Sequence, residues 1–202
     1  MEETYILEGE YRFATPNNAA PFSLRWSPDG NYLAVGLGDG TCALYLDKAN
    51  KPATIMDCRN GSDMRMPVTC IRWRPAETAE AATNVLLTVN AEGSATHWHA
   101  TTGRSVHTTK IEGEQFHCLD YRGDGLEYAV GCKSGAIKIF DEATKSEITT
   151  LRTGIEGRRG HSNRVFSLKY LNEYELVSAG WDANVLVWDL RTHHAEAVYY
   201  GP

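Results

Sequence analysis

An aromatic residue recurs four times along this chain, each time six residues after a residue that favours a turn. The aromatic residues are Tyr45, Trp98, Phe140 and Trp188, and the turn residues are Asp39, Glu92, Ser134 and Asp182. Glycine follows the turn residue in three of the four cases, as expected for a tight turn that needs positive φ. Short β-branched and aromatic runs flank each turn, so every unit predicts an antiparallel β meander.

The unit from 160 to 191 is the most complete of the four. It begins with Gly160-His161, continues through strand-like runs at 165–170, 175–180 and 185–189, and closes on Trp188-Asp189. This unit resembles a WD40 repeat, which forms one blade of a β-propeller. The resemblance implies that four of its side chains are linked by hydrogen bonds inside the blade, as a structural network: His161, Ser178, Asp182 and Trp188.

The resemblance extends over nearly the whole chain and predicts an all-β fold. We expect a WD40 β-propeller of four four-stranded antiparallel blades that form an incomplete ring. The expected ranges are a leading strand in 1–15 and blades at 16–60, 61–111, 112–156 and 157–202. Propellers have ~4–8 blades and this family usually has more than four. We therefore expect the N-terminal part of a longer propeller, completed by further C-terminal blades or by another chain.

Composition excludes several classes of function. The net charge of −6 gives no global basic field that would attract nucleic acid or a membrane surface. No run approaches the ~18 apolar residues of a transmembrane helix, and the acidic start Met1-Glu2-Glu3 is unlike a signal peptide. The five cysteines are odd in number and lie mostly in strand-like runs, which favours buried, reduced thiols. We expect a cytoplasmic protein, with cytoskeletal or ciliary association also open.

Three motifs that could carry chemistry have simpler interpretations. The Ser178, His161 and Asp182 set could be mistaken for a catalytic triad, but Ser178 lies inside a strand rather than on an exposed elbow. The glycine-rich segment 36–40 lies between two strands, which does not fit a phosphate loop. His97 and His99 share one strand face, but no third metal ligand is near in sequence. We expect no catalytic residues, no metal and no cofactor.

WD40 propellers commonly bind peptides on the face made by the connections between blades and the second hairpin turns. By this resemblance, the strongest candidates for partner binding are Arg164, Phe166 and Trp181, since aromatic side chains beside arginine are typical of interface hot spots. Four further candidates lie on the same expected face or on the basic loop before the fourth blade: Lys133, His117, Arg158 and Arg159. A partner with acidic flanks would suit this surface.

These features predict a non-enzymatic scaffold that mediates protein–protein interactions in a multi-subunit assembly. The alternative is a substrate receptor of a cullin-4 type ubiquitin ligase, because Trp188-Asp189-Leu190-Arg191 matches the short motif seen in such receptors. An enzyme that uses the central channel would need clustered carboxylates or histidines facing that channel, and we cannot assemble such a cluster from these strands.

Overall fold

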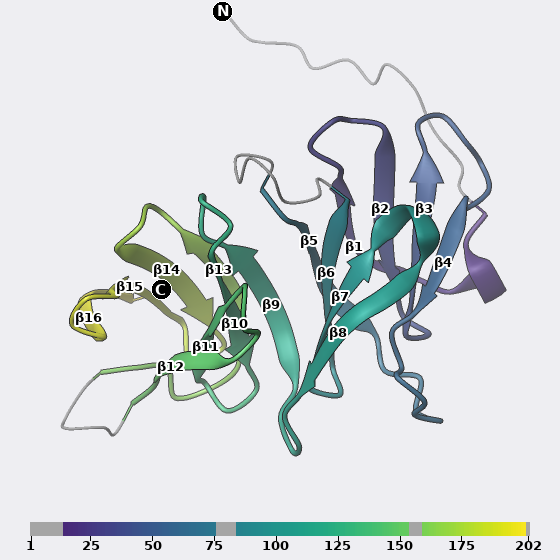
Figure 1. The fold of residues 1–202 in the computed structure, drawn as a ribbon. Helices are drawn as coiled ribbons and strands as arrows, with labels where there is room; N and C mark the ends of the chain where they lie inside the picture. Colours follow the sequence, from purple (N-terminus) through teal and green to yellow (C-terminus); the bar gives the residue numbers. More distant parts are fainter. Residues whose placement is uncertain (1–13, 76–83, 154–158, 201–202) are drawn as a thin grey trace, which may run out of the picture.

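The computed structural model describes residues 14–75, 84–153 and 159–200. They form four separate four-stranded sheets, in each of which consecutive strands are neighbours and pair antiparallel. The sheets follow one another in an arc that does not close into a ring (Figure 1). The predicted all-β propeller architecture is therefore confirmed. No helix among the described residues is long and apolar enough to cross a membrane.

Each sheet is one blade, numbered in chain order. Blade 1 comprises β1 (Pro21–Trp26), β2 (Tyr32–Leu37), β3 (Thr41–Leu46) and β4 (Thr54–Asp57), preceded by the 3-10 turn η1 (Pro16–Asn18). Blade 2 comprises β5 (Val68–Trp73), β6 (Val85–Asn90), β7 (Ser94–His99) and β8 (Arg104–Lys110), with η2 (Ala100–Thr102) before its last strand. Blade 3 comprises β9 (Phe116–Tyr121), β10 (Glu127–Cys132), β11 (Ile137–Asp141) and β12 (Glu147–Leu151). Blade 4 comprises β13 (Val165–Tyr170), β14 (Glu175–Gly180), β15 (Asn184–Asp189) and β16 (His194–Tyr200).

The turns before the third strands explain the glycine pattern of the sequence. Gly40, Gly93 and Gly135 have φ of +85°, +76° and +85°. In blade 4 the same position holds Ala183, which adopts φ of +60° despite its Cβ. The glycines of the first three blades therefore relieve a strain that blade 4 retains.

One predicted feature falls outside the described residues. The leading strand expected in 1–15 belongs almost entirely to residues 1–13, which the structure does not describe. The five cysteines are all free and buried, as their places in strand-like runs indicated.

In each blade after the first, one face of the first strand packs against the preceding blade. The side chains that do so are almost fully buried: Ile71 and Trp73, Leu119 and Tyr121, and Leu168 and Tyr170. The Trp73 Nε1–H also donates to the Arg25 carbonyl oxygen of blade 1 at 3.2 Å. The equivalent residues of blade 1, Leu24 and Trp26, are 54% and 50% exposed. The arc therefore ends on an apolar face at blade 1.

Apolar side chains meet at one equivalent position between blades 1 and 2 and between blades 3 and 4. Each pair takes one residue from each of two neighbouring blades. The residue of the earlier blade comes just before the aromatic residue of its third strand, and the residue of the later blade comes two positions after the aromatic residue of its own third strand. Between blades 1 and 2 this pair is Leu44 and Ala100, which belong to one buried cluster. Between blades 3 and 4 it is Ile139 and Leu190, which also share a cluster.

The equivalent pair between blades 2 and 3 is polar and buried. His97 Nε2 lies 2.9 Å from Glu142 Oε2, and the two residues are 1% and 2% exposed. Lys145 Nζ lies 2.6 Å from Glu142 Oε1, and the Tyr121 hydroxyl donates to Oε2 at 3.3 Å. Burial alone would raise the pKa of Glu142, but the hydrogen bond from His97 and the charge of Lys145 lower it. Burial lowers the pKa of His97, so its ring is neutral and donates from Nε2 to a carboxylate.

Candidate functional site

A β-bulge occurs at the same register position in the first strand of every blade. The pairing of first and second strands skips one residue in each sheet, and the skipped residues are Phe22, Thr69, His117 and Phe166. A bulged residue leaves the regular ladder and its side chain is re-aimed. The bulges thus present one side chain per blade at the edge of the arc where the first strands begin.

The turn between the second and third strands lies beside each bulge. In every blade a backbone N–H of this turn donates to a carbonyl two residues before the bulge, at 2.8 to 3.1 Å. The turn residues that donate are Gly38, Ala91, Lys133 and Trp181, and the carbonyls belong to Ala20, Pro67, Gln115 and Arg164. Three positions per blade, two on the strand side and one on the turn, therefore form a rim.

In blade 4 these three positions hold Arg164, Phe166 and Trp181, and their side chains stack. The Phe166 and Trp181 ring centres are 5.4 Å apart, and Arg164 Cζ lies 5.9 Å from the Trp181 ring centre. His117 of blade 3 extends the stack, with its ring 4.9 Å from that of Phe166. We call His117, Arg164, Phe166 and Trp181 the rim cluster. Trp181 is 65% exposed, so it does not fold back into its own blade.

The electrostatics of the rim cluster favour an anionic ligand. Burial lowers the pKa of His117, and the positive charge of Arg164 lowers it further, so its imidazole is neutral near pH 7. The charge of Glu114 raises the pKa of His117, and that of Lys133, an exposed residue of the adjoining turn, lowers it. His117 Nε2 is buried and has no hydrogen-bond partner among the described residues. The cluster therefore combines an open aromatic surface with the charge of Arg164.

The two arginines expected beside this cluster are placed differently. Arg159 is exposed in the connection that precedes blade 4, and none of the described contacts joins it to the rim cluster. Arg158 lies outside the described residues.

The side chains of His161, Ser178, Asp182 and Trp188 form a chain of hydrogen bonds inside blade 4. The Trp188 Nε1–H donates to Ser178 Oγ at 2.8 Å, and Ser178 Oγ lies 2.8 Å from His161 Nε2. His161 Nδ1 lies 2.9 Å from Asp182 Oδ1, so its proton is donated to the carboxylate. Burial would raise the pKa of Asp182, but this hydrogen bond and that from the Ser162 N–H lower it.

This network is inaccessible to a substrate. Ser178 and Trp188 are 0% exposed, and His161 is 1% exposed. A Cβ on Gly180 would lie 2.7 Å from His161 Nδ1, so the glycine makes room for the ring. In blade 2 only part of the network recurs: the Trp98 Nε1–H donates to Thr88 Oγ1 at 2.9 Å, while Glu92 accepts from Ser62 instead.

Comparison with known proteins agrees with this geometry. Residues 12–78 match the family described as "Anaphase-promoting complex subunit 4 WD40 domain", and residues 149–189 match "WD domain, G-beta repeat". A chain in the "Crystal Structure of Mitotic Checkpoint Complex" superimposes with a TM-score of 0.72 at 20% identity, over 92% of this chain and 52% of that one. The chain belongs to the WD40-repeat family.

Several curated WD40 relatives align with parts of the chain. "Meiotic fizzy-related protein 1" of Schizosaccharomyces pombe is 35% identical over 52% of this chain and 24% of that protein. "Anaphase-promoting complex subunit cdc20" of Dictyostelium discoideum is 30% identical over 50% of this chain and 19% of that protein. "Cell division cycle protein cdt2" of S. pombe is 29% identical over 45% and 19%. The aligned parts span only 19% to 24% of these relatives' length.

The Trp-Asp-Leu-Arg segment of this WD40 chain lies at the opposite end of blade 4 from the rim. The Arg191 guanidinium pairs with the Asp189 carboxylate at 2.7 and 3.0 Å and lies 5.3 Å over the Tyr174 ring. These hydrogen bonds lower the pKa of Asp189 to about 2. The Arg191 side chain is still 66% exposed, so it can contact a partner while bonded to Asp189.

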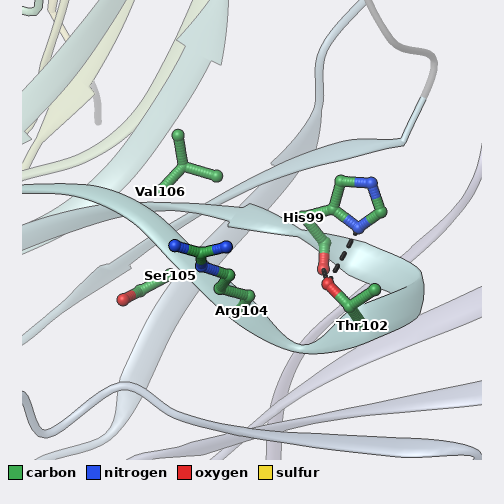
Figure 2. Close-up of a pocket in the computed structure, with 5 residues that line it drawn as sticks. All are labelled: His99, Thr102, Arg104, Ser105 and Val106. Carbon is green, nitrogen blue, oxygen red and sulfur yellow. Dashed lines mark hydrogen bonds between the residues drawn. The ribbon is translucent and has the colours of Figure 1, made fainter.

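A hollow lies on the outer edge of blade 2 (Figure 2). It has a volume of about 480 Å³ and is lined by His99, Thr102, Arg104, Ser105 and Val106. His99 Nδ1 lies 2.9 Å from the Thr102 hydroxyl, while His97 is engaged by Glu142, so the two histidines do not share a ligand. Among the residues that the structure describes, no group of three or more His, Cys, Asp or Glu could hold a metal ion.

Proposed function

We propose that this chain is part of a non-enzymatic WD40 scaffold that binds a protein partner through the rim cluster. The observation that carries the proposal is the continuous stack from His117 through Phe166 and Trp181 to Arg164, which leaves large aromatic rings open to solvent. Exposed aromatic side chains beside arginine are what interface hot spots consist of. The ligand that fits is a peptide segment with an apolar anchor and acidic flanks, and Lys133 and Arg159 add positive charge for those flanks.

The relatives support a place in a multi-subunit assembly. Three of the similar proteins carry names that describe them as a subunit or a cofactor of the anaphase-promoting complex. The solved WD40 chain with the same fold is itself part of a complex. We extend to this chain only the general role, a scaffold within such an assembly, and we expect it in the cytoplasm.

A test uses peptides selected from a random library on the whole 202-residue chain. Trp181→Ala and Arg164→Glu should each weaken a selected peptide by roughly 30-fold or more, as expected for hot-spot residues. The matched control is Phe22→Ala, since Phe22 holds the same bulge position in blade 1 but faces Gly38 rather than a tryptophan. Thermal unfolding should show that all three variants are folded. Unchanged peptide affinity in both folded rim variants would place the partner site elsewhere.

The alternative is a substrate receptor that contacts a cullin-4 adaptor through Arg191. The exposure of the Arg191 guanidinium over Tyr174 supports it. Here Arg191→Ala should abolish adaptor binding in a pull-down and leave peptide binding at the rim unchanged. Adaptor binding that persists in this variant would exclude the Arg191 contact.

A further inference from the structure

Positive side chains gather on the inner edge of the arc, away from the rim. The residue three positions after each bulge lies on the first strand of its blade, and these first strands adjoin one another at the centre of the arc (Figure 1). The four residues are Arg25, Arg72, Asp120 and Lys169. Three of the four positions are therefore cationic, in a protein whose net charge is −6.

The Asp120 carboxylate at this edge connects three blades. Asp120 Oδ1 accepts from Arg72 Nε at 3.0 Å, and Oδ2 lies 2.9 Å from Lys169 Nζ. The Tyr170 N–H also donates to Asp120 Oδ2, at 3.1 Å. Asp120 is 3% exposed, so it fixes the positions of Arg72 and Lys169 from beneath.

The positive charge at this edge exceeds what Asp120 neutralises. The Arg25 guanidinium donates to the Leu24 carbonyl oxygen at 3.3 Å, and no carboxylate among the described residues pairs with it. Arg72 Nη1 donates to the Ile71 carbonyl oxygen at 3.0 Å, which is likewise uncharged. Within the part of the chain that the structure describes, three cations and one carboxylate line this hollow, an excess of two positive charges.

That hollow has the size of a small-molecule site. Its volume is about 610 Å³, and its walls include Arg25, Arg72, Asp120, Lys169 and the backbone at Gly123. Pockets for small ligands typically occupy ~300–1,000 Å³. The aromatic residues in its wall, Trp73 and Tyr121, are only 8% and 5% exposed. The hollow thus combines three cationic side chains with apolar wall residues that include Pro28 and Pro75, and none of its aromatic rings is open to solvent as Trp181 is at the rim cluster.

We propose that this inner-edge hollow binds a compact anion that carries phosphate groups. Guanidinium groups match phosphate oxygens in a two-pronged geometry, and Arg25 and Arg72 supply two of them from adjacent blades. Lys169 adds a point charge from blade 4. A peptide with an aromatic-binding anchor is not expected here, because Trp73 and Tyr121, the aromatic residues that the structure describes in the wall, are almost fully buried.

The test is calorimetric titration of the whole chain with inorganic tripolyphosphate. Arg25→Gln and Lys169→Gln, each exposed and made singly, should weaken binding about tenfold or more. Lys110→Gln is the matched control, since Lys110 is also exposed but lies on an outer strand. Arg164→Glu separates this hollow from the rim and should leave tripolyphosphate affinity unchanged.

Three results would overturn the proposal. The first is absence of tripolyphosphate binding to the unmodified chain. The second is loss of binding in Arg164→Glu while Arg25→Gln and Lys169→Gln bind as the control does. The third is tighter binding of a hexaglutamate peptide than of tripolyphosphate, which would identify the ligand as an acidic chain segment. Binding that falls in both inner-edge variants and persists in both controls supports it.

Discussion

The junction between blades 2 and 3 and that between blades 3 and 4 solve the same packing problem with opposite chemistry. At equivalent positions one holds His97 and Glu142, and the other holds Ile139 and Leu190. Both pairs are buried or nearly so, and both junctions are otherwise lined by apolar clusters. A buried polar pair of this kind adds little net stability over an apolar pair, but removal of one partner leaves the other buried without its hydrogen bond. The difference distinguishes one junction from the others within a chain of similar repeats.

The largest effect should come from breaking the His97–Glu142 pair on one side only. Glu142→Leu removes the acceptor of His97 and the partner of Lys145, so we expect a loss of about 3–5 kcal/mol in the free energy of unfolding. The double variant His97→Leu with Glu142→Leu restores an apolar pair but still leaves Lys145 without its carboxylate, so it should recover about 1–2 kcal/mol of that loss. Urea denaturation measures both. If the single change costs no more than the double change, the two residues are not coupled.

A smaller effect is expected at the apolar junction. Ile139→Ala should lower the free energy of unfolding by about 2–4 kcal/mol, the usual range for a large aliphatic side chain truncated in a core. Val187→Ala is the matched control, because Val187 holds the same position in blade 4 and is only partly buried. It should cost about 1 kcal/mol. Equal losses at the two sites would mean that contact with the next blade contributes nothing at this position.

The smallest effect is on how the free energy of unfolding depends on pH, to which the His97–Glu142 junction contributes and the apolar junction does not. The pKa of His97 lies below its ordinary value of 6.5, so the folded chain binds fewer protons there than the unfolded chain. Stability from this group is complete above pH 6.5 and falls as the pH drops below it, by at most about 1.4 kcal/mol per pH unit. The pKa of Glu142 is lowered from 4.5, so its contribution is lost in the same direction at more acidic pH.

The double variant isolates this part of the pH dependence. We expect the free energy of unfolding, measured by urea denaturation from about pH 7 to about pH 5, to fall less steeply in the double variant than in the unmodified chain. Identical profiles would show that other histidines account for the acid sensitivity.

The propeller could be predicted because its signal is local and repeated. Each third-strand aromatic follows its turn by six residues, and this alone fixed the positions of β3, β7, β11 and β15 to within one residue or so. The adjacency of Arg164 and Trp181 also follows from strand register, and a hydrogen bond of 2.8 Å joins their backbones. Such features depend on residues of one blade.

Contacts between blades left no such signal. His97 and Glu142 are 45 residues apart, and His97 reads in the sequence only as one of two alternating histidines on a strand. The stacking of His117 on Phe166 likewise depends on how blade 3 meets blade 4. The inner-edge cations carry no such signal either, because an enzyme that uses the channel would place carboxylates and histidines there, whereas three of the four positions carry positive charge.

The bulge in each first strand separates recognition from folding. The residue at the bulge is skipped by strand pairing, so phenylalanine, threonine and histidine occupy one backbone position in different blades without altering the sheets. As the repeats of such a protein diverge, the residues at these positions can be substituted one at a time while the strand pairing stays the same. For protein engineering, the four bulge positions are the places where new binding residues could be introduced with the least risk to the fold.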